Sequence, residues 1–151
     1  MNRCIVLTAL ALLTTPALAQ SRFALDIHRA YVTLTATRDL QLHCSAAVPI
    51  EACTEILGLR LDCRCRHEQG RWVMTGSAQM VPYMYLSSLR LKPHEEAHLD
   101  DLRQRTETYF ADLESRSFES EQACRDEANF ESAVFSLRMD LFRHHSNEKL
   151  H

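Results

Sequence analysis

Apolar and polar residues alternate strictly between Leu59 and Arg66. A period of two is that of a half-buried β-strand, because successive side chains point to opposite faces of a sheet. We therefore predict a strand over these residues. A second, longer strand is predicted from Trp72 to Tyr85, after a turn at Glu68-Gln69-Gly70. Pro82 lies inside it and indicates an edge position, since proline has no N–H to donate to a neighbouring strand.

The pattern is weaker in the segments before these strands. Between Tyr31 and His43, threonines alternate with apolar residues over part of the length, which predicts one strand or two short ones. The segment from Pro49 to Leu57 begins with proline and is followed by Gly58, which predicts a short helix or an irregular cap.

After Pro93 the apolar residues recur at helical spacing. Leu99, Leu102, Tyr109 and Leu113 fall on one face, which predicts a single helix from Pro93 to near Arg116. A polar connection follows, in which Ser115, Ser117 and Ser120 are candidates for the N-cap of a second helix. The buried seam of that second helix is predicted to consist of Ala123, Phe130, Val134, Leu137 and Leu141.

Together these elements predict an α+β fold. It would consist of a small, mostly antiparallel sheet from Tyr31 to Leu86, followed by a two-helix hairpin packed on one face of the sheet. The number of residues is enough for one domain with a modest core.

The first 19 residues have the pattern of a signal peptide. Arg3 precedes an apolar run from Cys4 to Leu13, and Ala17-Leu18-Ala19 before Gln20 has the small-x-small form of a cleavage site. We therefore predict a periplasmic or secreted protein whose mature chain begins at Gln20. No later segment approaches about 18 consecutive apolar residues, so no membrane span is expected. The formal net charge of −3 offers no basic stripe for nucleic acid, and the oligomeric state stays open.

Cleavage after residue 19 would leave five of the six cysteines in an oxidising compartment. Cys44 and Cys53 are expected to close a short loop. Cys63 and Cys65 point to the same face of their strand, so they are not expected to pair with each other. One of them is expected to bridge to Cys124, which leaves one free thiol. A zinc site made of thiolates is not favoured, because the chain has no C-x-x-C pair.

The segment from His94 to His98 has the pattern H-E-x-x-H. On a helix this spacing presents two imidazoles on one face, where they can bind a single zinc ion. Glu95 leans toward the adjacent face, where its carboxylate can take a proton from a water molecule on the zinc. The alternative is a solvated first turn. Glu96 and Asp100 favour that alternative, because the stricter metalloprotease pattern has uncharged residues at both positions.

A catalytic zinc needs a third protein ligand and an open position for water. If the hairpin turns near Ser117, His98 faces roughly position 136 and His94 roughly position 140 of the second helix. This favours a histidine near the end of the chain, although such histidines also stabilise a helix dipole without any metal. The candidates, in order of preference, are His145, His144, Asp140 and Glu127.

The segment His94-Glu95-x-Ala97-His98-Leu99-Asp100 resembles a family of uncharacterised secreted bacterial proteins regarded as zinc-dependent proteases. In that family H-E-x-G-H is followed by an aromatic residue and Asp. The resemblance implies His94 and His98 as zinc ligands, Glu95 as the catalytic base, and a later pair that corresponds to Asp140 and His145. Arg143 and Ser146 stand here where the family has threonine and glycine.

We therefore expect residues 20–151 to form a single zincin-like domain of an exported zinc metallopeptidase, with a peptide or protein as its substrate. The alternative is a non-catalytic periplasmic binding or inhibitor domain that retains a zincin-like helix. The short length of the chain and its lack of a Met-turn or Gly-rich element favour this alternative.

Overall fold

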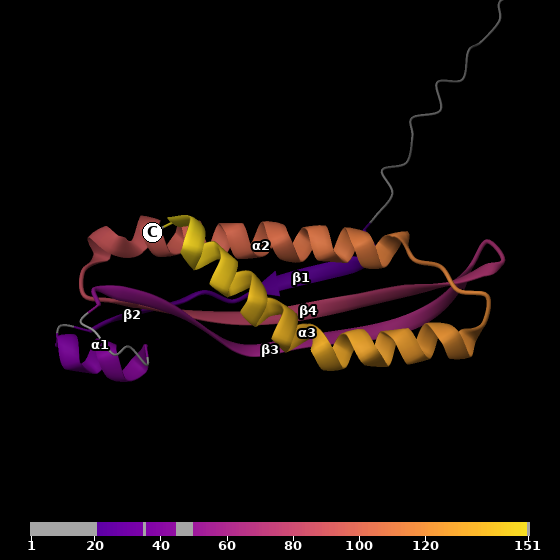
Figure 1. Ribbon diagram of the computed structural model, residues 1–151, viewed down its shortest axis with the longest axis horizontal. Coiled ribbons are helices and arrows are strands. Elements are labelled where there is room, and N and C mark those ends of the chain that lie inside the picture. Colours follow the sequence, from indigo (N-terminus) through magenta and orange to yellow (C-terminus); the bar gives the residue numbers. More distant parts are fainter. Residues whose placement is uncertain (1–20, 35, 45–49, 151) are drawn as a thin grey trace, which may run out of the picture.

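A computed structural model describes the backbone of residues 21–34, 36–44 and 50–150, and the side chains as far as Asp140 with the exception of Thr37 (Figure 1). Its elements in chain order are β1 (Phe23–Ile27), β2 (Ala30–Thr33), α1 (Thr37–His43), β3 (Ala52–Glu68), β4 (Arg71–Leu86), a 3-10 turn η1 (Leu89–Leu91), α2 (Lys92–Ser115) and α3 (Glu121–Leu150). No helix within the described residues is long and apolar enough to cross a membrane.

The sheet is mixed, with β4 as its central strand. β3 pairs antiparallel with one side of β4, while β1 and β2 lie end to end along the other side and run parallel to it. The prediction of a mostly antiparallel sheet is therefore wrong. Because α1 and the long strand β3 intervene between β2 and β4, the chain can return in the original direction, as a parallel pairing requires.

The elements before β3 also differ from the prediction. The segment Tyr31–His43 contains the end of β2 and then the helix α1, whose Leu40 is buried, while β1 was missed. The expected helix or cap at Pro49–Leu57 is wrong from Ala52 onward, where β3 begins. Short segments of this kind are decided by tertiary packing rather than by their own periodicity.

Pro82 lies in the central strand and not at an edge. The backbone oxygens of Met80 and Leu86 accept hydrogen bonds on the β1/β2 side, from His28 and Leu34 respectively. Alternate residues of a strand bond toward the same side, so the missing N–H of Pro82 faces that side as well. There it lies at the break between β1 and β2, where no ladder hydrogen bond is needed.

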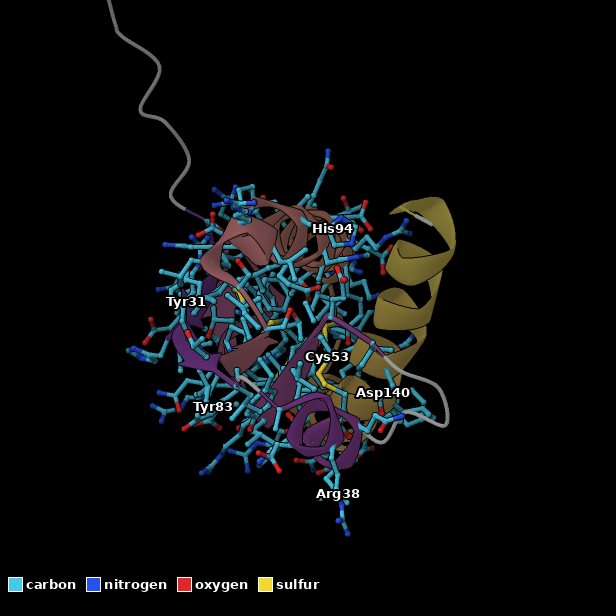
Figure 2. All side chains as sticks on the ribbon, turned by 90° about the vertical axis from the view of Figure 1, so that its left-hand side faces the viewer. Tyr31, Arg38, Cys53, Tyr83, His94 and Asp140 are labelled. Atoms are coloured by element: carbon cyan, nitrogen blue, oxygen red, sulfur yellow. A yellow bond between two sulfur atoms is a disulfide. The ribbon has the colours of Figure 1, made fainter. Side chains whose placement is uncertain are left out.

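Helices α2 and α3 cover the same face of the sheet (Figures 1 and 2). The core between these layers contains Phe23, Leu61, Met74, Ala78, Met80, Leu102, Tyr109, Phe110, Leu113, Cys124, Ala128, Phe135 and Met139. Helix α1 packs on the opposite face, where the rings of His43 and Tyr85 stack with centroids 4.7 Å apart. The predicted strands at 59–66 and 72–85 and the long helix from Pro93 are confirmed.

Two disulfides join the layers. Cys44–Cys53 ties α1 to β3, and Cys65–Cys124 ties β3 to α3. Cys63 is the free cysteine among the described residues. The predicted connectivity is thus confirmed, and the choice between Cys63 and Cys65 falls on Cys65.

Helix α3 buries a different face from the predicted seam. Phe130 and Leu137 are 54% and 62% exposed. The buried face carries Glu131 among apolar residues, and its carboxylate accepts hydrogen bonds from Tyr109 and Arg116 on the α2 side and from Arg138. These hydrogen bonds offset the cost of burying the carboxylate. The prediction assumed that the buried face of the helix is purely apolar and therefore chose the wrong face.

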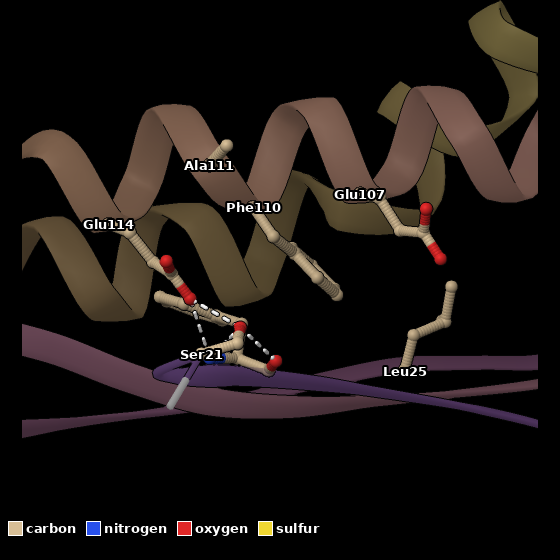
Figure 3. Close-up of a pocket in the computed structure, with 7 residues that line it drawn as sticks. Ser21, Leu25, Glu107, Phe110, Ala111 and Glu114 are labelled. Carbon is tan, nitrogen blue, oxygen red and sulfur yellow. Dashed lines mark hydrogen bonds between the residues drawn. The ribbon is translucent and has the colours of Figure 1, made fainter. Parts of the chain in front are cut away.

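The start of β1 is anchored to the end of α2 by one carboxylate (Figure 3). Oε1 of Glu114 accepts hydrogen bonds from the Ser21 hydroxyl and from the backbone N–H groups of Arg22 and Phe23. Burial by itself raises the pKa of the Glu114 carboxyl, but these hydrogen bonds outweigh burial and lower the pKa below its ordinary value of 4.5.

We expect Glu114→Gln to lower the melting temperature at pH 7 by about 3 °C, for a loss of about 1 kcal/mol. Because the folded pKa lies below the unfolded one, this stabilisation is present above the unfolded pKa and is lost as the pH falls through the folded pKa. The difference between parent and variant should therefore shrink below pH 4.5. Glu107→Gln is the control, because Glu107 lines the same pocket as Glu114. A difference that does not depend on pH would contradict the assignment.

Candidate metal centre

The two histidines lie in the first turns of α2. Pro93 occupies an early position of the helix, where its missing N–H leaves no hydrogen bond unmade. The side chain of Ser88 accepts from the N–H of Arg90 in the preceding 3-10 turn, which fixes the point where the chain turns into the helix. His94 and His98 are one turn apart, so both rings project from one face.

The imidazole rings of His94 and His98 lie within hydrogen-bond distance of each other. Nε2 of His94 and Nε2 of His98 lie 3.2 Å apart, with the rings nearly perpendicular at 89°. Two nitrogens bound to one tetrahedral zinc ion at 2.0–2.1 Å would be separated by roughly 3.3 Å. The observed separation is compatible with both nitrogens binding one zinc ion, and on this ground the residues present fit a metal ion.

Glu95 completes the cluster from the buried side of the helix. It is 4% exposed, and one of its carboxylate oxygens and one ring nitrogen of each histidine lie within 4.8 Å of one another. Its Oε2 accepts a hydrogen bond of 2.6 Å from the hydroxyl of Thr54 on β3. A carboxylate next to two imidazoles can either bind the same ion or take a proton from a water molecule near it.

The opposite flank of α2 carries charged residues with other partners. Glu96 accepts a hydrogen bond from the hydroxyl of Tyr31, and Asp100 lies 3.7 Å from Arg29 and from Arg103. Figure 2 shows Tyr31 on this flank and His94 on the flank toward α3. The two charged positions that weaken the metalloprotease pattern are thus turned away from the histidine pair.

The structure separates Glu127 from the histidines. Its carboxylate pairs with Arg116 at the far end of α2. Between His98 and Arg116 the helix rises by roughly 27 Å. Glu127 is therefore excluded as a ligand of this site. Asp101, on the same side of α2 as the histidines, pairs with Arg105 at 2.7 Å.

The register of α3 against α2 differs from the predicted one. The hydroxyl of Thr106 lies 3.2 Å from the sulfur of Met139. The predicted turn near Ser117 would have placed Thr106 level with roughly residue 128, so α3 is shifted by roughly eleven residues along α2 relative to the prediction. The shift arises because the connection between α2 and α3 is extended. In it, Phe118 forms backbone hydrogen bonds with Trp72 at the start of β4, so that α3 begins over β3.

This register brings the last turns of α3 toward the first half of α2, as Figures 1 and 2 both show. Residue 145 lies two turns beyond Arg138, whose guanidinium stacks over the Tyr109 ring of α2. The side chains of His144 and His145 lie outside the described residues, and Asp140 is exposed.

Thr54 is the site residue that the sequence did not reveal. It lies 41 positions before Glu95, in a segment for which a short helix or cap was predicted. Only the pairing of Thr54 with Met84 in β4 brings its hydroxyl under the first turns of α2.

No protein-family model matches this chain, and no curated protein or solved structure matches it at a significant level. The resemblance to secreted zinc-dependent proteases therefore stays a prediction that rests on the segment His94–Asp100.

The third ligand can be tested by zinc content. If His145 is the third ligand, we expect His145→Ala to lower the zinc bound per chain in protein purified without chelator. Glu127→Ala should retain the zinc of the parent, since its carboxylate serves Arg116. Zinc measured by atomic emission decides between them, and retention by His145→Ala with loss in Glu127→Ala would contradict the observed helix register.

Proposed function

We propose that the protein is an exported zinc-dependent hydrolase that cleaves peptide bonds at the cluster of His94, Glu95 and His98. The observation that supports this most is the 3.2 Å separation of the two Nε2 atoms beside a buried carboxylate. Borderline metal ions such as zinc and copper suit imidazole ligands. Two disulfides favour an oxidising compartment outside the cytosol.

His94 and His98 would hold the metal through their Nε2 atoms, with His145 as the proposed third ligand. When bound, the ion supplies Lewis acidity, which polarises the scissile carbonyl and makes a water molecule more acidic. Glu95 would accept the proton of the attacking water on one carboxylate oxygen and pass it to the leaving amine. Because the Glu95 side chain is almost completely buried, its carboxylate is shielded from bulk water.

A second candidate is a binding or inhibitor domain that holds metal without turnover. The bond from Thr54 to Glu95 favours it, because a buried carboxylate that accepts a hydroxyl is also a common way to fasten a helix to a sheet. Under this reading Glu95 would stabilise the fold and take no proton.

Substitution of the base and of a ligand separates the two candidates. Glu95→Gln should keep stoichiometric zinc while the hydrolysis of casein falls by about 10²–10⁴-fold, because an amide cannot accept the proton. His98→Ala should lose both zinc and activity. Glu96→Gln is the matched control, since Glu96 binds Tyr31 on the other flank.

Equal zinc in the parent, His98→Ala and the control would contradict metal binding at this site. A zinc-loaded parent without hydrolysis, or a Glu95→Gln variant as active as the parent, would contradict the enzyme and leave the binding domain.

A further inference from the structure

We propose that Thr54 is a positioning residue for Glu95, an inference that rests on the proposed hydrolytic function. Its hydroxyl has a single hydrogen, and this hydrogen is donated to Oε2 of Glu95 at 2.6 Å. The contact therefore selects one rotamer of the carboxylate and leaves the other oxygen as the one that can receive a proton.

Glu95 needs such a partner because of where it lies. A glutamate has three side-chain torsions, and its terminal torsion is broad, so the carboxylate of a free side chain samples many orientations. General-base catalysis requires an oxygen within hydrogen-bond reach of the proton that it abstracts. A donor that is already in place before the substrate binds removes the cost of ordering the carboxylate during the reaction.

The fold holds Thr54 on the inner face of the sheet. Thr54 is paired with Met84 of β4. Met84 is fully buried and packs with Leu99 of α2, the residue next to His98. The strand that carries the hydroxyl and the helix that carries the histidines are therefore fixed to the same buried contact.

On the outer face of the sheet, a disulfide holds β3 next to Thr54. Cys53 precedes Thr54, so its side chain points to the opposite face, where it bonds to Cys44 at the end of α1. Residues 53 and 54 are thus held from both sides, one by a covalent bond and one by the carboxylate of Glu95. A position held in this way is suited to orient a catalytic group.

The test uses Thr54→Val, which keeps the shape of the side chain and removes the donor, and Thr54→Ser, which restores a hydroxyl. Thr75→Val, in the adjoining strand β4, is the control for the change of residue type. Zinc per chain, the melting temperature, and kcat and KM for the hydrolysis of fluorescently quenched casein are measured for each full-length protein.

We expect Thr54→Val to keep its zinc and its KM while kcat falls by about ten- to a hundred-fold, with most of the loss recovered in Thr54→Ser. In a Glu95→Gln background, Thr54→Val should cause no further loss, because the group that it positions no longer acts. A purely structural role would lower the melting temperature without this dependence on Glu95.

Parent-like kcat in Thr54→Val, or equal further losses in the Glu95→Gln background, would overturn the role of Thr54 and leave the proposed function intact. A zinc-loaded parent that does not hydrolyse casein would overturn both. A Thr54→Val variant that loses zinc would also contradict the proposal, since Thr54 would then support the ligands and not the base.

Discussion

The packing of α2 against the central strand β4 holds the residues of the candidate metal centre in place. Leu99 of α2 and Met84 and Leu86 of β4 are almost completely buried against one another. Burial of large aliphatic side chains of this kind contributes about 1.5–3 kcal/mol each. Because His98 adjoins Leu99, this contact sets the rotation of α2 about its axis. The face of the helix that carries the histidines is thereby turned toward α3. The same rotation carries Glu95 down toward Thr54, so the position of all three site residues follows from one apolar contact.

Hydrogen bonding of the buried polar groups is the second constraint on the arrangement of the helices. No buried side-chain nitrogen or oxygen among the described residues lacks a hydrogen-bond partner. Burial, and then the hydrogen bond to Glu131, raise the pKa of Tyr109, so the phenol stays protonated and donates to that carboxylate. The guanidinium groups of Arg116 and Arg138 supply positive charge beside the Glu131 carboxylate. This network joins α2 to α3 and fixes the distance between the two helices where it lies.

Some features of the fold and of the candidate site are encoded locally in the sequence. The strand at Leu59–Arg66, the helix from Pro93 and the H-E-x-x-H spacing carry their own periodicity, and the disulfide partners followed from loop length and strand faces. The direction of strand pairing did not, because alternation is the same in parallel and antiparallel strands. The buried face of α3 was misjudged because its inward side carries Glu131 and its outward side carries Phe130 and Leu137. The register of α3 against α2 was predicted wrongly, and Thr54 was not predicted as a site residue, for the same reason. Both depend on how separate elements pack.

Binding of one metal ion between His94 and His98 can be measured by X-ray absorption of the zinc-loaded protein. We expect a shell of about four nitrogen or oxygen ligands at about 2.0–2.1 Å, with the multiple scattering of at least two imidazoles, and its loss in His94→Ala. Zinc–sulfur bonds at about 2.3 Å, which would point to Cys63, or a shell of oxygen ligands without imidazole, would show that the ion does not bind at this pair.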